Sequence, residues 1–190
     1  MIVAPKGERT GERYNGVMTK PTLSDPAITE RWLNDAAKLW LAHDGLWFQE
    51  VEKRLGMEAA IAMDKGAWAR FSPLEAARIK ERLGLPERGG LETLAKALRA
   101  RLYTLLNEDD LRLEDGRLVY TMTACRVQEA RRRKGLDDFP CKEVGIVEYD
   151  TFARAIDPRL RTRCLACPPD PHPRDFTCSW EFTLEGDGTE

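Results

Sequence analysis

The sequence predicts an α+β protein in which a helical N-terminal half packs on a small antiparallel sheet with inserted helices. Apolar residues recur at helical spacing in the first part of the chain, and the pattern changes to a period of two after Asn107. Asp115 and Gly116 separate two alternating runs, which is a strong signal for a β-hairpin. The chain has 190 residues, enough to bury a core without cross-links.

Three segments are expected along the chain. Residues 1–22 are polar and Gly-rich, which predicts a flexible N-terminal arm. A helical lobe should follow over 23–106, and an α+β lobe over 107–190. A chain of this length also allows the two lobes to form one integrated domain.

Five helices are expected in the helical lobe. Ser24 is the predicted N-cap of the first helix, and Gly45 is expected to interrupt it. Ser72, Pro73 and Glu75 form a capping box, which predicts that a new helix begins there. The expected helical ranges are 24–45, 46–56, 57–71, 72–84 and 91–106.

The α+β lobe should contain the hairpin, two helices and two further strands. The last two strands are joined by a proline-rich loop, "CPPDPHPRDFTC". The ranges are 111–124 for the hairpin, 125–135 and 141–157 for the helices, and 161–166 and 177–186 for the strands.

Composition excludes several classes of partner. The net charge is -2 and the pI is about 5.9, so there is no global basic field to attract nucleic acid. No apolar run approaches the roughly 20 residues that a membrane span requires. The N-terminus lacks the apolar segment of a secretory signal, so a cytoplasmic location is expected. The expected partner is a small-molecule ligand, and a homo-oligomer is compatible with the sequence.

The cysteines are the strongest chemical signal. Cys164 and Cys167 form a C-x2-C pair, a spacing that lets two thiolates reach one metal ion, and Cys178 and Cys141 could complete a zinc or iron–sulfur site. His172, in the proline-rich loop, is an alternative ligand. Two other interpretations stay open: thiols that only pack in the core, and a reactive or redox thiol. Without a metal, no cofactor is expected.

Other side chains could act on a ligand. His43 beside Asp44 is a candidate acid–base pair, although the same residues could serve as local helix caps. Arg131, in a dense basic cluster, could clamp a carboxylate or lie on a solvated helix face. Trp47 and Trp180 are candidates for lining an apolar pocket, with core packing as the alternative.

Longer stretches resemble known families. The segments "HDGLWFQEVEKRLGMEAAIAMD", "CRVQEARRRKGLDDFPCKEVG", "AIDPRLRTRCLACPPD" and "CSWEF" resemble an uncharacterised prokaryotic family of cytosolic proteins, over roughly residues 25–185. Residues 105–185 are similar to the L-2-amino-thiazoline-4-carboxylic acid hydrolase-like proteins at Cys125, Arg131, Cys141 and Cys178. The second resemblance implies hydrolysis of a C–N bond.

Two functions are therefore expected for a cysteine-rich site beside an apolar pocket. In the first, the protein hydrolyses a small thiazoline-like substrate, with Cys178 or Cys125 as nucleophile and His43 as a base oriented by Asp44. Arg131 would then bind the substrate carboxylate. In the second, a non-catalytic module binds a small ligand or zinc.

Overall fold

The computed structural model describes residues 13–14, 17–18, 25–171 and 175–185, and the predicted α+β class is confirmed. The chain divides into two compact units, Met1–Ala36 and Ala37–Glu190. The first contains a short antiparallel pair, β1 (Arg13–Tyr14) and β2 (Val17–Met18), and the beginning of α1. The predicted division between residues 106 and 107 falls inside the second unit.

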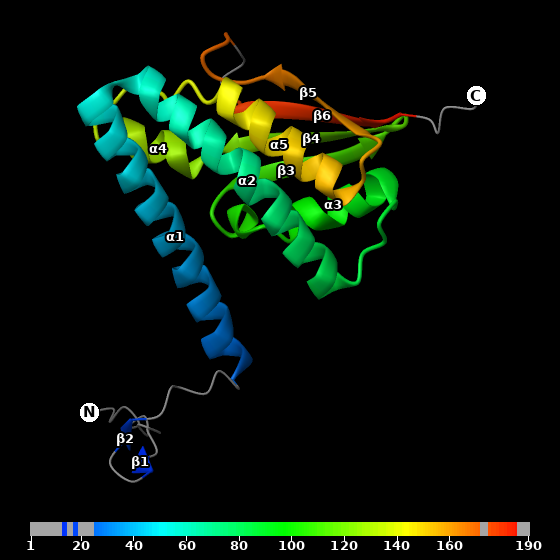
Figure 1. Cartoon of the computed structure of the whole chain (residues 1–190), viewed down its shortest axis with the longest axis horizontal. Helices are drawn as coiled ribbons and strands as arrows, with labels where there is room; N and C mark the ends of the chain where they lie inside the picture. The colour runs from blue at the N-terminus through cyan, green and yellow to red at the C-terminus, as the bar shows by residue number, and fades with distance from the viewer. Residues whose placement is uncertain (1–12, 15–16, 19–24, 172–174, 186–190) are drawn as a thin grey trace, which may run out of the picture. The chain divides into compact units, whose positions relative to one another are not determined.

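The described residues form five α-helices and one 3-10 helix (Figure 1). None of these helices combines the length and apolarity needed to cross a bilayer. Their bounds are α1 Pro26–Leu55, α2 Met57–Leu83, α3 Gly90–Arg99, the 3-10 helix Leu102–Leu105, α4 Arg126–Arg133 and α5 Lys142–Ile156.

α1 continues through Gly45, so the predicted break at this residue is wrong. A glycine inside a helix costs only about 1 kcal/mol relative to alanine, which weakens a long helix without ending it. The chain instead leaves the helix at Gly56, whose φ of 88° is one that glycine adopts easily. His43 and Asp44 therefore lie within a continuous helix. Ser24, the predicted N-cap, is outside the described residues.

α2 likewise continues through Ser72 and Pro73, so the predicted capping box does not begin a helix. Ser72 is buried, and its hydroxyl has no hydrogen-bond partner among the described residues. Proline in a helix interior removes one backbone donor and costs roughly 3 kcal/mol. Burial of Trp68, Ala76 and Ile79 in the core outweighs this cost.

A four-stranded antiparallel sheet follows, with the strand order β3-β4-β6-β5. Asp115 and Gly116 both have positive φ, 47° and 73°, as a two-residue type I′ turn requires. The predicted hairpin is therefore confirmed. The bounds are β3 Glu108–Glu114, β4 Arg117–Ala124, β5 Leu160–Ala166 and β6 Cys178–Leu184.

α5 packs on the sheet and is covered on its other side by α2 (Figure 1). Phe152 of α5 and Trp180 and Phe182 of β6 are fully buried between the helix and the sheet. Gly145 allows the close approach, because a Cβ at this position would lie 2.6 Å from Cζ2 of Trp180. The indole of Trp180 thereby fixes the spacing between α5 and β6.

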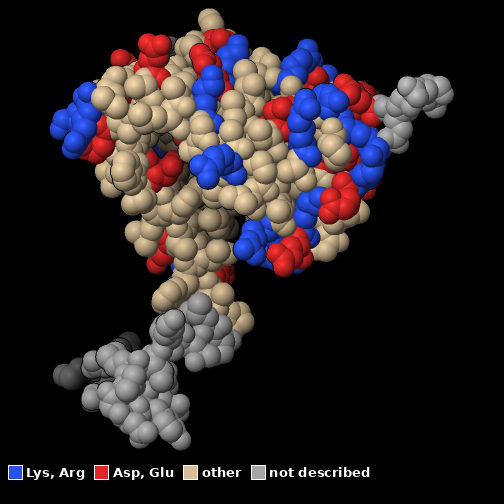
Figure 2. Space-filling model, viewed as in Figure 1, with Lys and Arg blue, Asp and Glu red and all other residues tan. Residues whose placement is uncertain are grey.

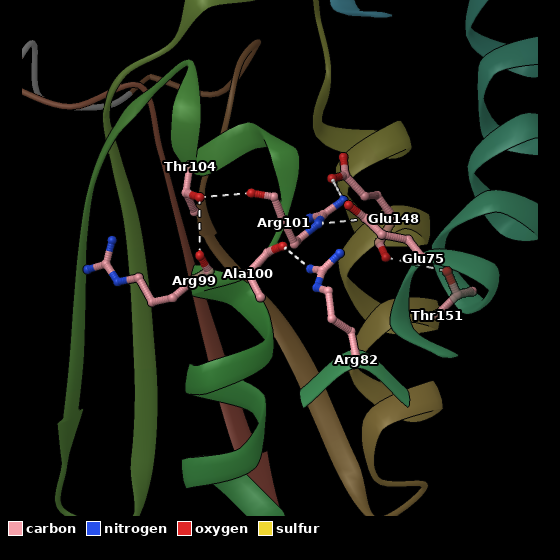
Figure 3. A network of polar contacts seen from close by, with 8 residues as sticks. All are labelled: Glu75, Arg82, Arg99, Ala100, Arg101, Thr104, Glu148 and Thr151. Carbon is pink, nitrogen blue, oxygen red and sulfur yellow. Dashed lines mark hydrogen bonds and ion pairs between the residues drawn. The ribbon is translucent and has the colours of Figure 1, made fainter. Parts of the chain in front are cut away.

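A buried arginine ties α2 to α5. The side chain of Arg101 lies between Glu75 of α2 and Glu148 of α5 (Figure 3). Arg101 is 3% exposed, and the distances are 2.9 Å to Glu75 (Nε–Oε2) and 2.8 Å to Glu148 (Nη2–Oε1). Its guanidinium also lies over the ring of Phe152, 4.7 Å from the centroid. Buried ion pairs of this kind are stable only while every charge keeps its partner.

The outer surface carries no separated charge fields on the face shown in Figure 2. Basic and acidic side chains are interspersed there with uncharged residues. This mixing agrees with the net charge of -2.

Candidate functional site

A cavity of about 410 Å³ lies within the unit formed by residues 37–190. This volume falls in the range of about 300–1,000 Å³ that small-molecule sites occupy. The lining residues come from α1, α2, α4, α5, β4 and β6 and from the segments that connect them. A pocket beside the cysteines, as the sequence predicted, is therefore present.

Aromatic rings form much of the cavity wall. Tyr149 and Trp180 lie 4.7 Å apart between ring centroids, and Phe48 and Phe139 lie 4.6 Å apart. Trp68 adds a further buried ring from α2. Rings that pack on one another in this way hold a fixed apolar surface toward the cavity.

Three thiols meet at one part of this wall. Cys141 directly precedes α5, Cys167 follows β5, and Cys178 is the first residue of β6. The sulfurs of Cys141 and Cys167 are 3.5 Å apart, and the thiol of Cys167 also hydrogen-bonds to Cys178. We call Cys141, Cys167 and Cys178 the thiol cluster.

Gln128 holds the segment that carries Cys141. Its amide donates to the carbonyl of Phe139 at 2.8 Å, and its carbonyl oxygen accepts from the Phe139 N–H at 2.8 Å. The same amide nitrogen lies 3.6 Å from Sγ of Cys141. Gln128 is 1% exposed, so α4 positions one member of the thiol cluster through a buried polar contact.

The thiols differ in their tendency to ionise. The hydrogen bond from Cys167, helped by one from Nε1 of Trp180 at 3.4 Å, lowers the pKa of Cys178 despite its burial. Burial raises the pKa of Cys125 to about 12 and also raises the pKa of Cys164. Cys178 is therefore the thiol best suited to carry a negative charge.

Carboxylates line another part of the cavity. Burial, together with the charges of Asp44 and Glu148, raises the pKa of Asp64 to about 7. Burial likewise raises the pKa values of Asp44 and Glu148. Asp64 is therefore about half protonated at neutral pH, and this wall carries less than its formal negative charge.

The basic cluster of α4 contributes to the cavity in two ways. Arg131 is bound on both sides of its fork by Glu52, at 2.7 Å and 2.9 Å, so a ligand carboxylate would have to displace that partner. Arg126 and Lys134 also line the cavity. The ammonium of Lys134 contacts the neutral amide oxygen of Gln49 at 2.8 Å and keeps its charge available.

The structure brings together part of the predicted site. The predicted residues at the cavity are Asp44, Cys125, Arg131, Cys141, Cys167, Cys178 and Trp180. His43 is exposed on α1, Trp47 is 64% exposed, and Cys164 is half-buried in β5, and none of these three lines the cavity. His172 lies outside the described residues.

Several lining residues escaped the sequence analysis. Glu148 and Tyr149 are buried on α5 and face the cavity together with Gln128 and Asp64. A buried polar residue looks like an exposed one in a sequence whose helices carry many charges. For Glu148 and Tyr149, only the packing of α5 between α2 and the sheet shows that these side chains are buried.

No metal geometry is evident in the described part of the chain. Among residues 13–14, 17–18, 25–171 and 175–185, no three His, Cys, Asp or Glu side chains are arranged to hold an ion. His172 is not among these residues. The zinc site proposed for Cys141, Cys164, Cys167 and Cys178 therefore stays a prediction, as does the oligomeric state.

Comparison with known proteins adds three findings. Residues 23–184 match the family of unknown function DUF6125. Curated protein sequences give no significant match. The fold is similar to that of a trafficking protein particle complex subunit 3 from Naegleria fowleri, whose crystal structure has palmitic acid covalently bound. The two chains share 10% sequence identity with a TM-score of 0.50, covering 82% of this chain and 98% of that chain, so the fold alone is shared.

Proposed function

The chain belongs to DUF6125, a family of unknown function, and we propose that it binds an elongated apolar small molecule in its cavity. The cavity itself carries this proposal: it holds about 410 Å³ and is walled by aromatic side chains. Burying apolar ligand surface against such a wall is favourable by about 25 cal/mol per Å². A preformed apolar pocket with a few polar groups is typical of ligand sites.

The structural neighbour supports an acyl chain as the ligand class. The subunit from Naegleria fowleri carries covalently bound palmitic acid, a long apolar chain with one carboxyl carbon. Ten per cent identity transfers no residue role to this chain, so the ligand class rests on the cavity and on the shared fold together.

The charges at the cavity favour a ligand with an acidic end. Within the described part of the chain, Arg126 and Lys134 line the cavity without a carboxylate contact, whereas Arg131 is paired with Glu52 and Glu148 with Arg101. A carboxylate near Arg126 and Lys134 would gain charge-assisted hydrogen bonds while the chain fills the apolar interior.

Cavity filling tests the proposal. Ala130 lines the cavity, so Ala130→Trp should occupy part of its volume, whereas Ala69 is exposed on α2 and Ala69→Trp is the matched control. Titration calorimetry with palmitate should show binding by the unaltered chain and by Ala69→Trp. Binding to Ala130→Trp should be weakened at least about tenfold, equivalent to about 1.4 kcal/mol.

The acidic end is tested separately. Palmitate should bind more tightly than hexadecanol, and Arg126→Ala with Lys134→Ala should remove that preference while leaving hexadecanol binding unchanged. An absence of palmitate binding by the unaltered chain, or equal loss in both tryptophan variants, would count against the cavity as the ligand site.

Hydrolysis of a thiazoline-like substrate is the second candidate. It is favoured by Cys178, which lines the cavity and whose sulfur receives hydrogen bonds from Cys167 and Trp180. His43 is exposed and outside the cavity lining, so a base for this reaction would have to come from elsewhere. Formation of a ring-opened product from 2-amino-thiazoline-4-carboxylate, abolished by Cys178→Ser and retained by Cys164→Ser, would support it.

A further inference from the structure

The thiol cluster offers chemistry that ligand binding does not use. Ala166 of β5 pairs with Ser179 of β6, so Cys167 and Cys178 come next to each other where the two strands end. Their side chains share a hydrogen bond, and Cys167 lies in sulfur contact with Cys141 on its other side. Cross-strand neighbours of this kind are close enough for a disulfide after small side-chain rotations.

Hydrogen-bonding groups surround the sulfur of Cys178. The indole Nε1–H of Trp180 lies 3.4 Å from Cys178 Sγ, and the Cys167 thiol hydrogen-bonds to the same sulfur. Both donors stabilise a thiolate, which is the form that attacks electrophiles. Cys178 also lines the cavity, so a small molecule in the cavity can reach it.

We propose that Cys178 and Cys167 form a hydroperoxide-reactive pair, in which Cys178 is oxidised by a hydroperoxide in the cavity and Cys167 closes a disulfide. Sulfenic acid formation and condensation with a neighbouring thiol are the usual course for an accessible thiolate with a partner. The inference concerns a reaction of the protein's own sulfurs and does not depend on the ligand proposed above.

The reaction balances without a further reactant. The Cys178 thiolate attacks the terminal oxygen of R–O–O–H, so an S–O bond forms, the O–O bond breaks and RO⁻ leaves, taking up the proton that the thiol had lost. The Cys167 thiol then attacks the sulfenic sulfur. An S–S bond forms, the S–O bond breaks, and the hydroxyl leaves as water with the Cys167 proton. Two thiols and one hydroperoxide thus give one disulfide, one alcohol and one water.

The structure selects this pair over the C-x2-C pair of the sequence. Cys164 lies opposite Trp180 in the β5–β6 ladder, and its sulfur is half-buried outside the cavity lining. Cys167 instead has its sulfur contacts with Cys141 and Cys178. The new disulfide would join the residue after β5 to the first residue of β6.

Disulfide mapping tests the assignment on the full chain. Trypsin should yield peptide 164–174, with Cys164 and Cys167, and peptide 175–190, with Cys178, while Cys141 lies in peptide 135–142. Reduced, chelator-treated protein is exposed to one equivalent of hydrogen peroxide or cumene hydroperoxide and mapped under non-reducing conditions. Mass spectrometry should find about one link per chain between peptides 164–174 and 175–190.

Three serine variants distinguish the sulfurs. Cys164→Ser and Cys141→Ser should keep the link, whereas Cys167→Ser should lose it and leave a sulfenic acid at Cys178 that dimedone captures. Cumene hydroperoxide reacting faster than hydrogen peroxide would indicate that the oxidant enters through the apolar cavity, and equal rates would overturn that part. A link lost in Cys164→Ser, a main product joining peptide 135–142, or no link in the unaltered chain would overturn the assignment. These outcomes differ from loss of palmitate binding, which concerns the proposed function alone.

Discussion

Replacing Gly145 by alanine should destabilise the protein, although alanine is the better helix former. A Cβ on this residue of α5 would lie 2.6 Å and 2.8 Å from Cζ2 and Cη2 of Trp180, which is 1% exposed. Carbon atoms pack best at about 3.5–4.0 Å, so the overlap is about 1 Å against a ring that other buried rings hold in place. Overpacking of a tight core costs about 1–3 kcal/mol, and an overlap this large against a fixed ring belongs near 3 kcal/mol.

A matched control separates the clash from helix propensity. Gly66 of α2 is also a helix-interior glycine, but its ideal Cβ has no atom within 4 Å among the described residues beyond its chain neighbours and the adjacent helix backbone. Gly66→Ala should stabilise the protein by up to about 1 kcal/mol. The same gain partly offsets the clash in Gly145→Ala, which leaves a net loss of about 2 kcal/mol and a difference of about 3 kcal/mol between the variants.

Urea unfolding followed by circular dichroism measures both variants. The m-value should stay unchanged, so that the midpoint shifts report stability directly. If Gly145→Ala proves as stable as Gly66→Ala, then Trp180 is not fixed against α5, and the rigid wall of the cavity assumed above does not exist.

Two further predictions concern buried charges. Asp64 has a folded-state pKa of about 7 against an ordinary value of 3.8, so the unfolded state loses its proton first and stability falls as pH rises from about 4 to about 7. Asp64→Asn removes this loss. The stability of the variant relative to the unaltered chain should therefore grow between about pH 4 and about pH 7, by at most about 1.4 kcal/mol per pH unit, and then stay level. A difference in stability that does not change with pH would contradict the burial of Asp64. Arg101→Met should lower the free energy of unfolding by roughly 3–5 kcal/mol at pH 7, measured in urea, because it leaves Glu75 and Glu148 without their cation. A loss below about 1 kcal/mol would show that this ion-pair network is dispensable.

The helices show where local sequence signals fail. Gly45 and the Ser72–Pro73 pair are ordinary helix-ending signals, yet α1 and α2 pass through them. The two signals correspond to roughly 1–3 kcal/mol. In α2, burial of Trp68, Ala76 and Ile79 exceeds that amount, whereas in α1 only the smaller cost of one glycine has to be offset. The turn at Asp115-Gly116 was predictable because positive φ at both positions is a steric demand that few other residues meet.

The thiol site also depends partly on local sequence signals and partly on tertiary contacts. The sequence predicted that Cys141, Cys164, Cys167 and Cys178 gather beside an apolar pocket, but it did not show which of these sulfurs touch one another. The C-x2-C spacing pointed to Cys164, but a strand turns successive side chains to opposite faces, and the register of β5 on β6 brought Cys167 to Cys178 instead.

The sequence by itself determined the α+β class, the hairpin and the supply of thiols near the C-terminus, because periodicity and turn sterics act over a few residues. The tertiary structure alone decided which elements enclose the cavity, that Gln128 and Glu148 are buried beside it, and that Cys141, Cys167 and Cys178 line it without Cys164. These features depend on contacts between residues far apart in the chain. Their energies come from packing that no local pattern encodes.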